Sequence, residues 1–269
     1  MKLQDKVVLL TGAGSGIGRH LAGEFARQGA RLILTDVDES KLQETIRTQE
    51  IEASVLGTVA ANFLEDGEPE RVVEEALALS PRIDVLYNNA GMMVLGQIRN
   101  QEWSDFERQQ RVNLTAPVRM THLLLPTMIA QGGGYIGFTC SASALATPPG
   151  AGSYGITKAG IAAFSEALRA EVRRHDISVT TVCPGFVHTP LAQSATYRDA
   201  KTANQTKNVP RFVGSSPERV ARISVRALVK KKGVVVINFD EKLKVFIKYT
   251  SEWLYTKLNV LLARLLLDS

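Results

Sequence analysis

A tyrosine and a lysine four positions apart, Tyr154 and Lys158, are the residues whose types and spacing point most directly to chemistry. On an α-helix this spacing places both side chains on one face, one turn apart. A phenol has a reference pKa of about 10, and a neighbouring ammonium group favours the phenolate and lowers that pKa. We therefore expect Tyr154 to exchange a proton with an alcohol or an alkoxide. The spacing also occurs by chance on amphipathic helices, so the rest of the chain must decide.

A glycine-rich turn near the amino terminus is typical of a dinucleotide-binding site. The apolar run 7–10 predicts a buried strand, which leads into the sequence TGAGSGIG at residues 11–18 and then into a helical pattern. Gly12, Gly16 and Gly18 permit a tight turn, close approach to a pyrophosphate and close packing of helix on strand. The free N–H groups of a helix that begins near Gly16 favour phosphate oxygens.

The cofactor is predicted by the end of the second expected strand, residues 31–35. Asp36 follows that strand, eighteen residues after Gly18. A carboxylate at this place binds both ribose hydroxyls of NAD and repels the 2′-phosphate of NADP. We therefore expect NAD, with NADP as the less favoured alternative.

Helix-like and strand-like segments alternate along most of the chain, which predicts an α/β fold with a parallel sheet. The expected helices cover residues 38–50, 66–79, 101–130 and 154–175, and the further strands cover 54–60, 83–87, 134–139, 177–183 and 234–238. The stretch 192–213 fits no periodic pattern.

Composition limits the class of protein. Of the 269 residues, 45% are hydrophobic and 22% are charged, as in ordinary globular domains. Cys140 and Cys183 imply no disulfide framework, and the four histidines have no metal-ligand spacing. The first residues lack the apolar region of a signal peptide and no apolar run reaches transmembrane length, so we expect a cytoplasmic protein.

The net charge of +5 is concentrated near the carboxyl end. Residues 226–269 hold nine Lys or Arg and four Asp or Glu, which accounts for the whole excess. The remainder of the chain is neutral, which argues against nucleic-acid binding.

Six motifs in order make the chain closely resemble the short-chain dehydrogenase/reductase family over roughly residues 6–238. They are TGAGSGIG at 11–18, NNAG at 88–91, Asn113, Ser141, the Tyr154–Lys158 pair and PGFVHT at 184–189. The resemblance implies a Rossmann-type doubly wound sheet of seven parallel strands with helices on both faces. It also implies one catalytic domain over residues 1–238, a substrate lid at about 190–214, and a homodimer or homotetramer.

The resemblance also implies roles for individual residues in hydride transfer between a nicotinamide and a carbinol or carbonyl carbon. Tyr154 is the expected catalytic acid/base, and Lys158 lowers its pKa and holds the nicotinamide ribose. Ser141 hydrogen-bonds the substrate oxygen, and Asn113 supports a water-linked proton relay. The residues expected to bind NAD are Gly12, Ser15, Gly16, Ile17, Gly18, Asp36, Asn62, Asn89, Ala90, Gly91, Tyr154, Lys158, Pro184, Gly185, Val187 and Thr189.

Two departures from the family pattern bear on the cofactor. An Asp usually follows the third strand and contacts adenine, whereas this chain has Asn62, an amide that can donate or accept there. Members that use NADP often carry a basic residue inside the glycine turn, where this chain has Ser15. The second departure supports NAD.

The residues expected around the substrate are apolar, which favours a bulky hydrophobic alcohol or ketone. Part of the set is equally expected to belong to the core; its members are Met92, Met93, Val94, Leu95, Ala142, Ala144, Leu145, Ala146, Phe186 and Leu191.

Residues 239–269 predict an amphipathic helical extension. Apolar residues recur at three- and four-residue steps from Leu243 to Leu265, with Trp253 and Tyr255 among them. Two interpretations stay open: a helix lying on an anionic membrane surface, or a helix packed on its own domain or a neighbouring subunit.

A rival function on the same fold is a non-catalytic nucleotide sensor or scaffold. Such a protein has no need of a complete catalytic set. The presence of Asn113, Ser141, Tyr154 and Lys158 together therefore favours an enzyme.

Overall fold

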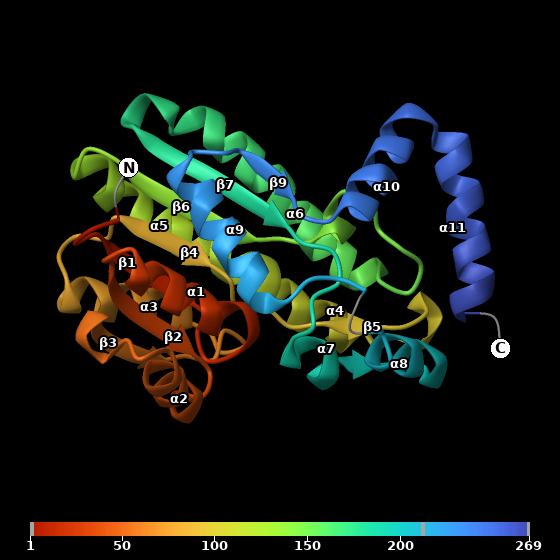
Figure 1. Cartoon of the computed structure of the whole chain (residues 1–269), viewed down its shortest axis with the longest axis horizontal. Helices are drawn as coiled ribbons and strands as arrows, with labels where there is room; N and C mark the ends of the chain where they lie inside the picture. Colours follow the sequence, from red (N-terminus) through yellow and green to blue (C-terminus); the bar gives the residue numbers. More distant parts are fainter. Residues whose placement is uncertain (1–2, 211–212, 268–269) are drawn as a thin grey trace.

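Seven parallel strands form the central sheet of the computed structural model, which describes residues 3–210 and 213–267 (Figure 1). Across the sheet the order is β3-β2-β1-β4-β6-β7-β9, and every neighbouring pair is parallel. The strands are β1 (Val7–Thr11), β2 (Arg31–Asp36), β3 (Val55–Ala60), β4 (Val85–Asn88), β6 (Gly134–Thr139), β7 (Ile177–Cys183) and β9 (Val234–Val236). The predicted doubly wound fold is confirmed.

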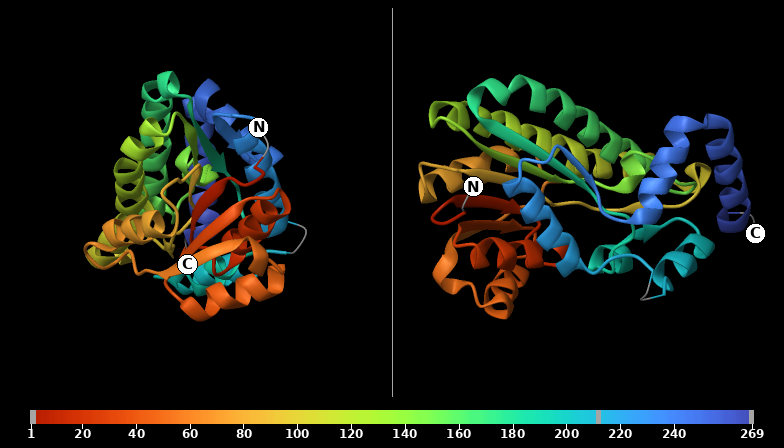
Figure 2. Two further views of the ribbon diagram at one scale, coloured as in Figure 1. Left: turned by 90° about the vertical axis from the view of Figure 1, so that its left-hand side faces the viewer. Right: turned by 45° about the horizontal axis from the view of Figure 1, so that its top comes forward.

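Helices cover both faces of the sheet (Figures 1 and 2). One face carries α1 (Gly16–Arg27), α2 (Glu39–Gln49) and α9 (Pro217–Val229). The other carries α3 (Glu68–Leu79), α5 (Ala116–Ala130) and α6 (Gly152–Glu171). Because both faces are covered, the strands consist of nearly continuous apolar runs, as in β1.

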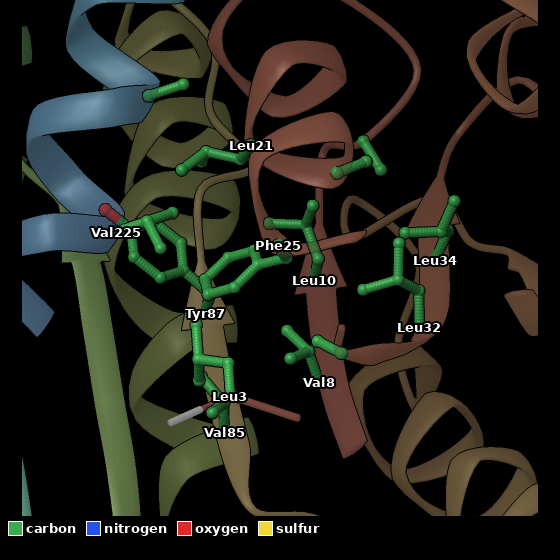
Figure 3. Packing of buried hydrophobic residues seen from close by; sticks show 14 of the residues in the cluster. Leu3, Val8, Leu10, Leu21, Phe25, Leu32, Leu34, Val85, Tyr87 and Val225 are labelled. Atoms are coloured by element: carbon green, nitrogen blue, oxygen red, sulfur yellow. The ribbon is translucent and has the colours of Figure 1, made fainter. Parts of the chain in front are cut away.

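The alternation of side chains along β1 divides the core into two layers. Val8 and Leu10 pack with Phe25 of α1, whose ring meets Tyr87 of β4 edge-on at 5.7 Å between centroids (Figure 3). Leu9 points to the opposite face and packs among residues of α3 and α5. Burial on both faces therefore suits β1 to its interior position between β2 and β4.

The strand order reverses between β1 and β4. The chain leaves β1 toward β2 and β3 and then returns to β4 on the other side of β1. The turns that follow these two strands consequently run in opposite directions and leave a crevice at the carboxyl edge of the sheet, which is where ligands bind in such folds.

The helical stretch predicted at 101–130 contains an irregularity. It comprises α4 (Trp103–Gln110), a π-helical turn at Arg111–Thr115 and then α5, with Asn113 inside the turn. Single π turns inside helices are rare and are frequently found at functional sites.

The stretch 192–213, which showed no pattern, contains short elements. They are α7 (Pro190–Ser194), β8 (Thr196–Tyr197), which pairs with β5 (Val94–Leu95), and α8 (Ala200–Lys207). Each is too short for a periodic signal. Tertiary contacts hold this segment in place: Arg198 donates to both carboxylate oxygens of the buried Asp105 at 2.7 and 2.8 Å. Residues 211 and 212 of the expected lid lie outside the described residues.

The predicted C-terminal helical extension is present as a hairpin of two helices, α10 (Phe239–Thr250) and α11 (Glu252–Leu267). The helices separate at Ser251, whose backbone is extended and whose hydroxyl accepts a hydrogen bond from the N–H of Leu254. Ser is a good cap and a poor helix former, which explains the break. No described helix is long and apolar enough to cross a membrane.

Asp84 joins three parts of the chain beneath the central strands. Its carboxylate accepts hydrogen bonds from the N–H of Val7 at 3.1 Å, from Lys6 at 3.0 Å and from Arg82 at 2.7 Å. Burial by itself raises the pKa of Asp84, but these hydrogen bonds and the nearby charge of Lys6 outweigh it and leave the pKa below the ordinary value.

We expect Asp84→Asn to lower the free energy of unfolding by about 2 kcal/mol at neutral pH, because charged hydrogen bonds to a buried acceptor are lost. A carboxylate with a depressed folded pKa stabilises the protein above its unfolded pKa of about 4, and this contribution is lost as the pH falls through the folded pKa. The difference between wild type and Asp84→Asn in urea unfolding should therefore shrink below about pH 4.

The control is Asp66→Asn, because the Asp66 side chain is 93% exposed and its ion pair with Arg111 lies at the surface. An equal loss of stability in both variants, or a difference that does not change with pH, would contradict the role given to Asp84.

Candidate active site

A cavity of about 1290 Å³ lies over the carboxyl ends of the strands. Among the predicted site residues, only Gly18 and Asn113 do not line it. Those that do are Gly12, Ser15, Gly16, Ile17, Asp36, Asn62, Asn89, Ala90, Gly91, Ser141, Tyr154, Lys158, Pro184, Gly185, Val187 and Thr189. Segments far apart in the sequence thus contribute to a single site.

The turn after β1 has no room for side chains at its glycines. Gly12 has a φ of +65°, and a Cβ there would lie 2.7 Å from the Cα of Ala90. A Cβ on Gly18 would lie 1.8 Å from the carbonyl oxygen of Gly12, so this residue permits close packing of α1 on the turn and stays behind the cavity wall. Gly16, with a φ of +51°, faces Thr189. The backbone of this turn is therefore open to a ligand.

Asn89 ties three strands together at the crevice. Its side-chain amide donates to the carbonyl oxygens of Thr11 and Gly12 at 3.2 and 3.0 Å, and its amide oxygen accepts from the Thr139 hydroxyl at 3.0 Å. The Thr11 hydroxyl in turn accepts from the N–H groups of Asn89 and Ala90. These bonds occupy the side chain of Asn89, which therefore positions the cavity wall.

Asp36 ends β2 at one end of the cavity. Its carboxylate accepts from the N–H of Gly14 at 2.9 Å and, more weakly, from that of Asp38 at 3.4 Å. Two basic residues that we did not predict, Arg19 and Lys41, line the same end. Arg19 donates to the Gly14 carbonyl and to Glu44, so its guanidinium is already held by the protein.

Asn62 lines the cavity after β3, but its side chain is engaged in its own loop. Its amide oxygen accepts from the N–H of Leu64 at 3.2 Å, and its amide nitrogen donates to Glu65 at 3.3 Å. A ligand can therefore reach the surface of Asn62, while its amide serves local structure.

Tyr154 and Lys158 lie in the first two turns of α6, opposite Ser141. The Lys158 ammonium lies 5.7 Å from the centroid of the Tyr154 ring and donates to the carbonyl oxygen of Thr139 at 3.1 Å. Lys158 is only 4% exposed. The Ser141 hydroxyl accepts hydrogen bonds from the N–H and the hydroxyl of Ser143 at 3.2 and 2.8 Å. Three of the four residues expected to be catalytic, Ser141, Tyr154 and Lys158, therefore line the same cavity.

Burial dominates the ionisation of this pair in the protein alone. It raises the pKa of Tyr154 above the ordinary value, although a side-chain hydrogen bond with Ser141 acts in the opposite direction. Burial also lowers the pKa of Lys158, because both groups lose solvation, which favours the neutral phenol and weakens the ammonium. The lowering of the Tyr154 pKa by Lys158 therefore stays a prediction.

Asn113 lies behind the cavity in the π turn and is 1% exposed. Its side chain forms two hydrogen bonds with the backbone of Met92, accepting from the N–H at 2.8 Å and donating to the carbonyl at 2.9 Å. It also donates to the Thr157 hydroxyl at 3.2 Å. These contacts position the strand that follows Gly91, and a water relay through Asn113 stays a prediction.

The residues expected around the substrate divide into two groups. Lining the cavity are Met92, Met93, Leu95, Ala142, Ala146, Phe186 and Leu191. The other three do not line it: Val94 is fully buried in the short strand β5, and Ala144 and Leu145 pack against the core beside α6. The interpretation of part of this set as core residues was therefore correct.

Sequence reasoning missed the contribution of the C-terminal hairpin to the cavity. Residues of both α10 and α11 line it: Glu241, Lys244, Ile247, Tyr255, Leu258, Asn259, Leu261 and Leu262. The amphipathic pattern identified an apolar face, but it carried no signal for the part of the protein that this face would meet.

We expect the Tyr154 phenol to remain protonated beyond pH 10 in the cofactor-free protein, because burial disfavours its anion. The measurement is a ¹³C NMR titration of protein labelled at tyrosine Cζ, with the resonance assigned by its absence in Tyr154→Phe. A Tyr154 resonance that titrates below the reference value of about 10 would show that Lys158 dominates after all.

Known proteins similar to this chain were found by both sequence and structure. The family model described as short chain dehydrogenase matches residues 6–200. The protein named oxidoreductase SadH of Mycobacterium tuberculosis is 35% identical over 247 residues, covering 89% of this chain and 88% of that protein. Dehydrogenase/reductase SDR family member 7B of Bos taurus is 32% identical over 271 residues, covering 97% and 82%.

A solved structure similar to this one contains a dinucleotide. It is a short chain dehydrogenase/reductase from Burkholderia phymatum in complex with NAD, with a TM-score of 0.87 and 25% sequence identity. The superposition covers 94% of this chain and 96% of that protein.

Proposed function

Because the chain belongs to the short-chain dehydrogenase/reductase family of oxidoreductases, we propose that it transfers a hydride between NAD(H) and a hydrophobic secondary alcohol or ketone. The observation that carries this proposal is the cavity shared by Tyr154, Lys158 and Ser141 with the glycine turn and Asp36. One end of it suits a dinucleotide and the other end is lined by apolar side chains.

The residues at the crevice fit a dinucleotide. Gly12 and Gly16 keep the turn bare of side chains, since a Cβ at Gly12 would meet the backbone of Ala90 and one at Gly16 would meet Thr189, and α1 begins at Gly16 with free N–H groups. Asp36, at the end of β2, would hold a ribose, and Val187 and Thr189 line the same cavity. When bound, NAD(H) supplies the hydride donor or acceptor carbon.

The protein's own part in the reaction is to orient the substrate and move one proton. Ser141 can hydrogen-bond the substrate oxygen, and Tyr154 can donate its proton to that oxygen during reduction or accept one during oxidation. The raised pKa of Tyr154 keeps the proton on the phenol in the free protein, which is the form that ketone reduction requires. Lys158, which donates to the Thr139 carbonyl, would hold the ribose.

Tyr154→Phe should keep dinucleotide binding but lower turnover by about 10²–10⁴-fold or more, because the ring remains and the proton donor is lost. The test compares the variant with wild type by NADH absorbance on a panel of hydrophobic ketones and alcohols. The control, Tyr249→Phe, changes a tyrosine that is 71% exposed and does not line the cavity. Near-wild-type turnover by Tyr154→Phe on an accepted substrate would disprove the assignment.

Asp36→Ala should shift the cofactor preference from NAD toward NADP, because a carboxylate that repels the 2′-phosphate is removed while Arg19 and Lys41 remain nearby. The measurement is kcat/KM for each cofactor. Asp66→Ala is the control, because the Asp66 side chain is 93% exposed and does not line the cavity. A wild-type protein that prefers NADP would overturn the NAD proposal.

We keep three further expectations as proposals: a homodimer or homotetramer, a cytoplasmic location, and contact of the C-terminal hairpin with a membrane surface. The last is supported by large exposed apolar side chains on the hairpin, among them Phe239, Phe246 and Trp253. The rival function, a non-catalytic sensor or scaffold, gives Tyr154 and Lys158 no role as a pair.

A further inference from the structure

The cavity is larger than one ligand requires. Its volume of about 1290 Å³ exceeds the roughly 300–1,000 Å³ of a pocket for a single small ligand. Because the lining extends from the glycine turn and Asp36 to the C-terminal hairpin, a dinucleotide at the glycine turn would leave the hairpin end to a second molecule. The boundary of that remaining space is formed in part by the hairpin of α10 and α11.

The hairpin wall changes from polar to apolar with distance from the strand ends. Glu241 of α10 lies against the turn after β7, since a Cβ on Gly185 would be 2.7 Å from its Cγ. Lys244 pairs with Glu241 at 2.9 Å. On α11 the lining residues are mostly apolar, namely Tyr255, Leu258, Leu261 and Leu262, with Asn259 among them. A substrate with its polar end at Ser141 would thus direct an apolar part toward α11.

Hydrogen bonds fix this wall relative to the catalytic residues. Lys248 donates to the carbonyl of Leu145 at 2.7 Å, and the Tyr255 hydroxyl donates to the carbonyl of Thr147 at 3.3 Å. Both acceptors lie in the loop between Ser141 and α6. The far end of α11 is held as well, because Gln97 donates to the carbonyl of Leu267 at 3.0 Å.

Two leucines of α11 line the cavity and keep part of their surface accessible. Leu258 is 39% exposed and Leu261 is 54% exposed, although both are lining residues. From Tyr255 to Leu262 the lining extends over two turns of helix, about 10 Å at 1.5 Å per residue. This is roughly the length of an extended chain of eight methylenes, and burying it would be favourable.

We propose that the α10–α11 wall binds the unbranched alkyl tail of the substrate, and that the enzyme selects secondary alcohols and ketones with a chain of about eight carbons or more. The inference rests on the proposed function and names the substrate class of that site. Leu258 is a specificity residue in this arrangement: it contacts the tail and takes no part in hydride or proton transfer.

The test uses methyl ketones from 2-butanone to 2-decanone with NADH. Each methylene that reaches the wall should raise kcat/KM about four-fold, since burying one is worth about 0.8 kcal/mol. Leu258→Gln, which keeps length and helix propensity, should lower kcat/KM for 2-decanone at least 10-fold more than for 2-butanone. The matched control is Leu254→Gln, one turn earlier on α11, because Leu254 is 40% exposed and does not line the cavity.

The inference is overturned if wild type shows no preference for longer ketones, or if both glutamine variants lose the same factor on 2-decanone; the proposed reaction would survive either result. A binding measurement separates the inference about the α10–α11 wall from the proposed reaction. Calorimetry should show 2-decanone binding to Tyr154→Phe, and adding Leu258→Gln should weaken that binding. If wild type reduces no ketone but this binding is observed, the wall is supported and the reaction is wrong; absence of binding overturns the wall.

Discussion

The site depends on the close approach of the turn after β1 to the turn after β4. β1 and β4 are neighbouring strands, but the chain continues from them in opposite directions. The turns that follow them therefore start close together and then diverge beyond the edge of the sheet. Asn89 holds the two turns together through the Thr11 and Gly12 carbonyls, and its oxygen accepts from Thr139. Thr139 in turn offers its carbonyl to Lys158. A single chain of hydrogen bonds therefore connects the dinucleotide cradle with the proposed catalytic lysine.

This connection has an electrostatic consequence. Tyr154 and Lys158 are positioned by burial among strand ends and α6, and the same burial disfavours the charged form of each group. The spacing of the pair alone suggested that the lysine would assist ionisation of the phenol. In the free protein, burial keeps the proton on the Tyr154 phenol. Under the proposed function, this protonated phenol is the form that donates a proton during ketone reduction.

Most of the fold could be predicted from the sequence because burial on both faces leaves a clear mark. Apolar runs such as that of β1 and the alternation with helical patterns predicted the seven strands. The part that failed depends on contacts across the chain. The pairing of β5 with β8 and the contact of Arg198 with Asp105 join segments about a hundred residues apart, and two-residue strands have no detectable period. The residue types of the site were predictable, but the engagement of Asn62 and Asn113 by neighbouring backbone was not.

The C-terminal hairpin shows the limit of an amphipathic pattern as a predictor of function. The pattern predicts which residues share a face. Both interpretations of the extension, binding to a membrane and packing on protein, assumed that it uses one face for one purpose. The structure divides it. Leu258 faces the cavity, whereas Trp253 does not line it. Trp253 is 66% exposed, and the Lys257 ammonium lies 4.2 Å from the centroid of its ring. Packing on its own domain therefore uses side chains other than those that the proposed contact with a membrane would use, and the first does not exclude the second. Under the proposed function, a lipophilic substrate would bind on the inner side of the hairpin. This binding does not depend on what the outer side of the hairpin contacts.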